Sequence, residues 1–262
     1  MRRRTLGWWL YQPYKYLIFA PIVVLATSFF SLCAFVLSLI APARFAARVT
    51  AVPWARLLAL ATPMRLDVVR RCRIDPDQSY VLVSNHQSQY DILVLYGWLG
   101  VDFKWVMKEE LRRVPCIGYS CERLGHVFID RSNHAAAIAS LEAAKKKIVD
   151  GTSVIFFPEG TRSRDGRLLP FKKGAFRMAI DLGLPILPLT VSGTRDVLPA
   201  GTIDLLPGRA RLTIHPPVPT KGLSEATAEE LAARVRRIIA AELSGSGESQ
   251  LNPESEPAGF GD

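Results

Sequence analysis

The sequence predicts an α/β fold, with a mostly parallel central sheet that is flanked by helices and preceded by an N-terminal hydrophobic helix or helical pair. Two observations lead to this prediction. Residues 17–40 form an apolar run of 24 residues without a charged side chain. Beyond residue 75, short runs rich in β-branched residues alternate with segments of helical pattern, which is typical of parallel strands joined by helices. A chain of 262 residues, 49% of them hydrophobic, can also bury a sizeable core.

The first 73 residues are predicted to anchor the protein to a membrane. A helix over residues 17–40 is long enough to cross a hydrocarbon core of about 30 Å. Residues 1–73 contain 11 Lys and Arg and one acidic residue, whereas the remaining 189 residues contain 22 basic and 23 acidic residues. The positive charge therefore lies beside the apolar run, which favours contact with anionic lipid over contact with nucleic acid. The run is longer than the core of a signal peptide, so a retained anchor is expected.

The geometry of this anchor is open at the level of sequence. Arg44, Arg48 and Arg56 follow the apolar run and Arg2, Arg3, Arg4 and Lys15 precede it, so the distribution of charge gives no clear orientation. A second apolar segment, residues 52–63, is too short to span a bilayer. Both a single span and a bent helical pair embedded in one leaflet fit these features.

The elements of the α/β domain, residues 74–243, follow from the alternation of patterns. The predicted strands are residues 79–84, 103–107, 127–129, 153–157, 186–191 and 209–215, and the predicted helices are residues 92–99, 135–149, 175–182 and 228–243. Ligands of such folds bind at the carboxyl ends of the strands. Residues 244–262 have almost no apolar content and are expected to form a disordered tail.

Neither a metal site nor a disulfide framework is expected. The four cysteines, at positions 33, 72, 116 and 121, show neither a CxxC motif nor a Cys/His spacing typical of zinc ligands. We therefore expect reduced thiols, no metal and no bound cofactor.

A histidine and an acid lie at the end of the first strand of this domain, in the segment SNHQSQYD that ends at Asp91. On one continuous helix, residues five apart could not face each other. If the chain turns after His86 and a helix begins near Ser88, however, the Asp91 carboxylate can reach back to the imidazole. The acid would then leave the second ring nitrogen free as a base, as in a catalytic triad. A helix cap formed by the same residues is the alternative.

Two further motifs carry an arginine at a strand end. FPEGTRS, residues 157–163, combines Gly160, which permits close approach of the backbone, with Arg162, whose guanidinium can grip a phosphate. GHVFIDR, residues 125–131, supplies Arg131. Together with the His/Asp pair, these arginines indicate acyl transfer to an alcohol that carries a phosphate.

These motifs, together with the segment LPILPL at residues 184–189, resemble the four ordered blocks of the glycerolipid acyltransferases. The resemblance covers about residues 75–220 and is strongest to the branch that acylates 1-acyl-sn-glycerol-3-phosphate to phosphatidic acid. It implies that His86, oriented by Asp91, is the general base and that an acyl-CoA or an acyl carrier protein is the co-substrate. It also implies a set of residues for the phosphate and glycerol parts of the substrate: Lys108, Arg131, Glu159, Gly160, Thr161 and Arg162.

Three alternatives remain at this stage. The acceptor could be another lysolipid, such as a lyso-ornithine lipid. A non-catalytic membrane lipid-binding protein could retain the fold, although the intact His86–Asp91 pair disfavours it. A serine hydrolase is disfavoured because the GxSxG motif is missing. Since acyl thioesters are intracellular, the resemblance implies a protein of the cytoplasmic membrane with the α/β domain on the cytoplasmic side.

Overall fold

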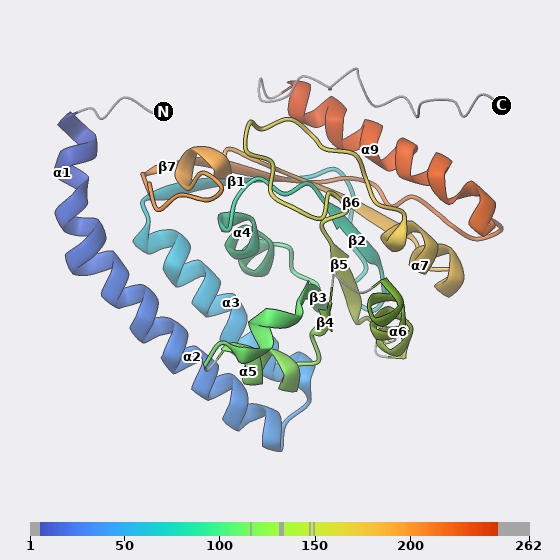
Figure 1. Ribbon diagram of the computed structural model, residues 1–262, viewed down its shortest axis with the longest axis horizontal. Helices are drawn as coiled ribbons and strands as arrows, with labels where there is room; N and C mark the ends of the chain where they lie inside the picture. Colours follow the sequence, from blue (N-terminus) through green and yellow to red (C-terminus); the bar gives the residue numbers. More distant parts are fainter. Residues whose placement is uncertain (1–5, 116, 131–133, 147, 149, 246–262) are drawn as a thin grey trace.

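A computed structural model describes residues 6–115, 117–130, 134–146, 148 and 150–245 of the chain. Within these residues, seven strands form one sheet in the order β1-β7-β6-β2-β5-β3-β4 (Figure 1). The strands are β1 (Met64–Arg70), β2 (Val81–Ser84), β3 (Phe103–Lys108), β4 (Val127–Ile129), β5 (Ser153–Phe156), β6 (Ile186–Ser192) and β7 (Gly208–Ile214). The predicted tail lies outside the described residues except for Ser244 and Gly245, which end the last helix.

The helices of the α/β domain are α4 (Tyr90–Trp98), α5 (Ile117–Arg123), α6 (His134–Lys145), α7 (Gly174–Leu182), α8 (Thr194–Val197) and α9 (Ala228–Gly245), with short 3-10 segments η2 (Glu109–Arg113) and η3 (Glu225–Thr227). Helices α4, α6, α7 and α9 lie where the sequence predicts them. The short elements η2, α5 and α8 have too few residues to show a helical period, and the sequence analysis missed them.

The prediction of a mostly parallel sheet is confirmed. Strands β6, β2, β5, β3 and β4 are paired in parallel, so their carboxyl ends meet at one edge. The pair β1–β7 is also parallel, but β7 runs antiparallel to β6. One correction concerns β1, which lies before residue 73 in the segment assigned to the anchor. It pairs with β7 alone and is half-exposed, which explains the charged residues Arg65 and Asp67 within it.

Two apolar clusters, one on each face of the sheet, hold the domain together. Alternate residues of one strand enter different clusters: Leu82 of β2 packs with α4, whereas Val81 and Val83 pack with α7 and α9. This alternation follows from the period of two in a strand. The sheet is therefore buried on both faces, as Figure 1 shows, and each face is covered by its own set of helices.

The N-terminal region forms a helical hairpin. Helix α1 (Leu6–Tyr14), the π-helical segment η1 (Lys15–Phe19) and α2 (Ala20–Ile40) make one long helical run, and α3 (Ala43–Ala61) returns beside it. The run from Trp8 to Ile40 is long and apolar enough to cross a membrane, and 11% of its most apolar window is buried. It begins earlier than the predicted start at residue 17, because the aromatic segment before it is also helical.

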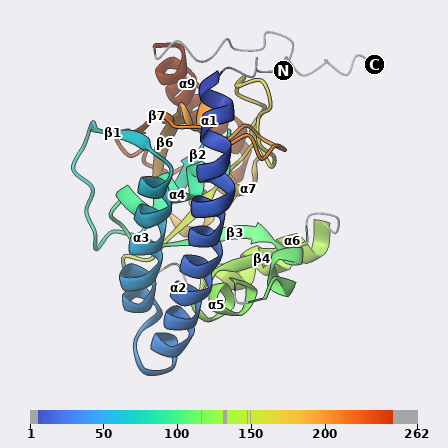
Figure 2. The same cartoon turned by 90° about the vertical axis from the view of Figure 1, so that its left-hand side faces the viewer.

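The long run lies across the α/β domain instead of projecting from it. Figure 2 shows α3 on one side of α2 and α5 on the other. The side chain of Ser120 on α5 donates a hydrogen bond of 2.8 Å to the carbonyl of Ser31, and Arg123 donates one of 3.1 Å to the carbonyl of Ser38. At the other end, the Tyr14 hydroxyl donates to the carbonyl of Ala61 over 2.6 Å.

Candidate active site

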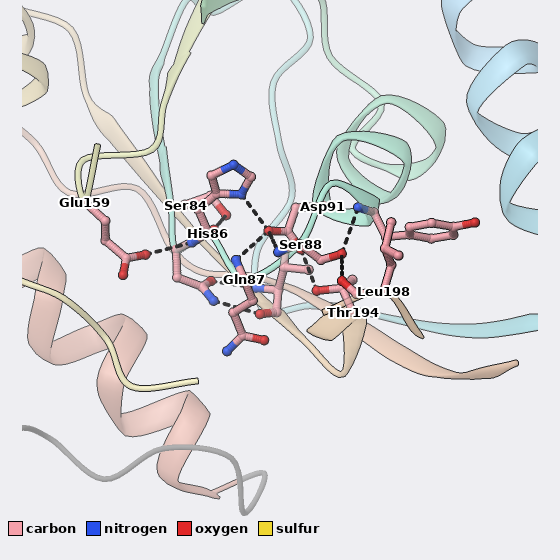
Figure 3. A network of polar contacts seen from close by, with 11 residues as sticks. Ser84, His86, Gln87, Ser88, Asp91, Glu159, Thr194 and Leu198 are labelled. Atoms are coloured by element: carbon pink, nitrogen blue, oxygen red, sulfur yellow. Dashed lines mark hydrogen bonds and ion pairs between the residues drawn. The ribbon is translucent and has the colours of Figure 1, made fainter. Parts of the chain in front are cut away.

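The predicted histidine–acid pair forms at the carboxyl end of β2. The chain turns after Ser84, α4 begins at Tyr90, and Asp91 in its first turn reaches back to the imidazole of His86. His86 Nδ1 lies 2.8 Å from Asp91 Oδ2 (Figure 3). Because a carboxylate only accepts, this contact places the proton on Nδ1 and leaves Nε2 free as an acceptor. The Asp91 side chain is fully buried, and that of His86 is 16% exposed.

The carboxylate of Asp91 is held by more than the imidazole. Its Oδ2 also accepts the backbone N–H groups of Gln87 and Ser88, over 2.7 and 2.9 Å. Its Oδ1 accepts the hydroxyl of Thr194, at the start of α8. Four donors therefore compensate the burial of this charge and fix its orientation. The Gln87 and Ser88 donors precede α4, and the start of this helix has no side-chain cap, so the Asp91 carboxylate fixes the His86 turn and does not cap the helix.

Glu159 does not lie where the sequence analysis placed it. The residue is only 5% exposed, and its carboxylate accepts two backbone N–H groups. Oε1 accepts from His86 over 2.7 Å and Oε2 from Leu169 over 2.9 Å. Burial raises its pKa to about 7, against the opposing effect of the two N–H donors. Glu159 is thus a positioning residue that ties the His86 turn to the FPEGTRS loop.

An aromatic surface supports the other side of the imidazole. The rings of His86 and Phe157 stack with centroids 3.8 Å apart and an interplanar angle of 10°. Trp105 of β3 stacks in turn on Phe157, at 5.6 Å. The His86 carbonyl accepts the backbone N–H of Ser163 over 2.8 Å. The ring is therefore fixed by a carboxylate, a stacked ring and the loop that carries Arg162.

The remaining predicted residues divide into three groups. Gly160, Thr161 and Arg162 lie on the loop after β5, beside His86, and Arg162 is half-buried. Lys108 is the last residue of β3, exposed and paired in register with Ile129 of β4. Arg131 lies outside the described residues. The structure thus gathers the second motif around the His86 turn and leaves Lys108 at the neighbouring strand end.

Three contacts near His86 escaped the sequence analysis. Thr194 supports Asp91 from 103 positions away, and no spacing rule could connect them. Asn85 exchanges two hydrogen bonds of 2.8 Å with the backbone of Val191 and so joins the ends of β2 and β6. The side chain of Lys172 lies over Gly160. Asn85 was recognised as part of a motif, but its structural role was not.

Nucleophilic serine chemistry finds no support in the geometry. The Ser88 hydroxyl donates to the carbonyl of Leu198 over 2.6 Å, and that of Ser163 donates to Asp165 over 3.1 Å. Neither hydroxyl is hydrogen-bonded to an imidazole. Among the residues that the structure describes, no group of three His, Cys, Asp or Glu side chains could hold a metal ion.

Comparisons with known proteins find acyltransferases similar to this chain. A family model described as Acyltransferase matches residues 65–192. The chain is 34% identical over 203 residues to the 1-acyl-sn-glycerol-3-phosphate acyltransferase alpha of Ovis aries, covering 76% of this chain and 71% of that protein. It is 41% identical over 143 residues to a chloroplastic 1-acyl-sn-glycerol-3-phosphate acyltransferase of Brassica napus, covering 54% of this chain but only 41% of that protein.

A solved structure extends the likeness to nearly the whole chain. The 1-acyl-sn-glycerophosphate acyltransferase PlsC from Thermotoga maritima superposes with a TM-score of 0.74 and 30% sequence identity. The superposition covers 90% of this chain and 96% of that protein. The N-terminal helices and the sheet are therefore included in the likeness, in addition to the segment that carries the motifs.

Proposed function

The chain belongs to the family of the 1-acyl-sn-glycerol-3-phosphate acyltransferases, and from this premise we propose that it transfers a fatty acyl group to the sn-2 hydroxyl of 1-acyl-sn-glycerol-3-phosphate. The product is phosphatidic acid, a precursor of phospholipids. The observation that carries the proposal is the contact of 2.8 Å between His86 Nδ1 and the fully buried Asp91 carboxylate. It leaves Nε2, the atom that a general base needs, without a hydrogen bond to any residue in the described part of the chain.

The reaction follows from the chemistry of a thioester. His86 Nε2 removes the proton of the sn-2 hydroxyl while the hydroxyl oxygen attacks the thioester carbonyl, giving a tetrahedral intermediate and an imidazolium. The intermediate expels the thiolate, which takes the proton back from Nε2, so the histidine is regenerated. Asp91 stabilises the imidazolium through Nδ1. Because a thioester is already activated, the enzyme needs no nucleophile of its own.

Arg162 is proposed to hold the substrate phosphate. It is half-buried on the loop that donates a backbone N–H to the His86 carbonyl, and it makes no hydrogen bond or ion pair with a described side chain. A guanidinium in this position can bind two phosphate oxygens at once. Lys108 is a second candidate at the neighbouring strand end, and Arg131 is a third, outside the described residues.

The acyl donor is proposed to be acyl-CoA or an acyl-acyl carrier protein, and no resident cofactor is required. A panel of both donors against several lysolipids, including a lyso-ornithine lipid, tests this directly with the purified full-length chain. We expect turnover with 1-acyl-sn-glycerol-3-phosphate to exceed turnover with lysolipids that lack a phosphate monoester. Preferred acylation of a lyso-ornithine lipid would contradict the proposed acceptor.

The protein associates with membranes through its apolar N-terminal helix, and we propose that this helix lies in the plane of one leaflet. The α/β domain and α3 contact it from Tyr14 to Ser38, a length of roughly 36 Å at the helical rise. That length exceeds a hydrocarbon core of about 30 Å. A perpendicular helix would therefore draw Arg123 and its charged neighbours into the bilayer, whereas a helix in the plane leaves them at its surface.

Two measurements test this arrangement. The outer face of α2 exposes Phe29 by 61% and Leu32 by 62%. Replacing both with Asn should reduce flotation with anionic liposomes, whereas Ile203→Asn, at a residue that is 70% exposed on another part of the surface, should leave flotation unchanged. Equal flotation of both variants would contradict α2 as the contact.

The second measurement determines the side of the membrane. We propose that the α/β domain faces the cytoplasm, where acyl thioesters occur. In a variant whose own cysteines are replaced with serine, Ala41→Cys places one thiol at the end of α2. If the helix lies in one leaflet, an impermeant thiol reagent should label it only from the cytoplasmic side. Labelling from the opposite side would show that the helix spans the bilayer.

A further inference from the structure

The backbone of Lys172 is hydrogen-bonded to the loop that carries Glu159, Gly160 and Arg162. Its backbone N–H donates to the carbonyl of Pro158 over 2.9 Å. Glu159, the next residue after Pro158, accepts the backbone N–H of His86. Hydrogen bonds to the adjacent residues Pro158 and Glu159 therefore place the backbone of Lys172 close to the His86 turn, although Lys172 and His86 are far apart in the sequence.

The side chain of Lys172 lies over Gly160. A β-carbon added to Gly160 would be 2.9 Å from both Cε and Nζ of Lys172 and 3.4 Å from its Cδ, so the end of the lysine side chain lies directly over the glycine. Gly160 also has a φ of +73°, which favours glycine independently. Lys172 is exposed, and its ammonium group lies at the surface of the loop that carries Arg162.

Neighbouring cations are neutralised, and Lys172 is not. Lys173 pairs with Glu229 at 2.6 Å, and Arg177 pairs with Glu225 at 3.0 Å, both towards the start of α9. Lys172 is exposed and makes no hydrogen bond or ion pair through its side chain with any residue in the described ranges. Two adjacent lysines therefore have different surroundings: one serves the packing of α7 against α9, and the other presents its charge on the Gly160 turn.

We infer that the Lys172 ammonium binds the phosphate of the lysolipid acceptor together with the guanidinium of Arg162. This inference rests on the proposed function, because it assigns a further residue to the same acceptor site. A phosphate monoester has more than one negative charge and several acceptor oxygens. A guanidinium, with its paired donors, and a nearby ammonium together match it better than either cation alone. A larger residue at position 160 would strain the turn, because φ is +73°, and would also displace the ammonium.

The test compares Lys172→Met with Lys173→Met, two equal changes at adjacent positions. Equilibrium binding of 1-acyl-sn-glycerol-3-phosphate in detergent micelles is measured alongside KM and kcat, so that binding has a readout without turnover. A charge-assisted hydrogen bond contributes enough for Lys172→Met to raise Kd and KM for this lipid by about 10- to 100-fold. Lys172→Arg should restore most of the loss, whereas Lys173→Met should change Kd less than about twofold, as expected for an exposed ion pair.

Each outcome separates the inference from the proposed function. If the wild-type chain transfers acyl groups and Lys172→Met binds the acceptor as tightly as Lys173→Met, the inference is wrong and the proposed function stands. A rise in the KM of the acyl donor alone would also overturn it, because the lysine would then serve the donor.

If the wild-type chain binds the lipid without acylating it, the proposed function is wrong, and the Kd comparison still decides the role of Lys172. No binding by the wild type would overturn both. Should Lys172→Met fail to fold, a smaller dependence of Kd on salt in Lys172→Gln than in the wild type decides the same question.

Discussion

Replacing Asp91 with asparagine separates the charge of this residue from its hydrogen bonds. Oδ2 accepts the backbone N–H groups of Gln87 and Ser88 as well as His86 Nδ1. Since the two backbone donors cannot turn away, the amide oxygen of the asparagine must take the place of Oδ2. Its NH₂ group then faces the Thr194 hydroxyl, which can accept instead of donating. Asp91→Asn should therefore keep the fold and the tautomer of the imidazole.

The loss of activity should come from the missing charge alone. Two opposite unit charges about 4 Å apart attract by about 4 kcal/mol at an effective dielectric constant near 20. Because the imidazolium is only partly formed in the transition state, we expect kcat to fall by about 10²- to 10³-fold. That is less than the roughly 10⁴-fold loss known where an asparagine turns the histidine into the wrong tautomer.

The assay pairs acyl transfer to 1-acyl-sn-glycerol-3-phosphate with urea unfolding. The free energy of unfolding of Asp91→Asn should stay within about 1 kcal/mol of the wild type, since each buried donor keeps a partner. The control, Asp91→Ala, leaves these donors unpaired at about 1–3 kcal/mol for each buried group and should be much less stable. Wild-type turnover in Asp91→Asn, or equal destabilisation of the two variants, would refute the reasoning.

Three further predictions follow from single side chains. Glu159→Gln offers one acceptor to two N–H groups, so kcat should fall. Burial raises the pKa of the Glu159 carboxyl to about 7, so the wild type loses stability as the pH rises from about 4.5 to 7. Urea unfolding should show a smaller loss of stability over this range in Glu159→Gln. His215 is buried, which lowers its pKa to about 4, so the folded state loses roughly 3 kcal/mol as the pH falls from 6.5 to 4; His215→Gln should remove that part of the pH dependence, and an unchanged dependence would contradict the assignment. Arg162→Lys keeps the charge but loses the fork, so KM for the acceptor should rise with little change in kcat, and an unchanged KM would remove Arg162 from the phosphate site.

The sequence was sufficient for the parts of the fold that follow from local patterns. Val127–Ile129 and Ser153–Phe156 are fully apolar or nearly so and lie between turn signals, and both are strands within one residue of the prediction. The His86–Asp91 contact was also predictable, because only a turn between the two residues allows it. The edge strand Met64–Arg70 was missed although its first residues alternate apolar and charged side chains. It directly follows an apolar helix, and the helical pattern masked the change of period.

The site required tertiary information wherever a contact joins distant segments. Glu159 lies 73 positions from His86, so nothing in its motif showed that its carboxylate serves a backbone N–H instead of a substrate. Lys172 was overlooked for a similar reason. Two adjacent lysines are equivalent in the sequence, and only the pairing of Lys173 with Glu229 distinguishes them. The positions of these side chains are set by packing between helices, strands and loops, and the spacing of residues within a motif does not encode that packing.

The central claim is that His86 is the base in acyl transfer to the sn-2 hydroxyl. The most direct measurement offers labelled acyl-CoA, or labelled acyl-acyl carrier protein, and 1-acyl-sn-glycerol-3-phosphate to the purified wild type and to His86→Ala, and then locates the label in the product. We predict label at the sn-2 position of phosphatidic acid with the wild type, and a rate at least about 10²-fold lower with the variant at an unchanged melting temperature. Near-normal transfer by a folded His86→Ala protein would contradict the account.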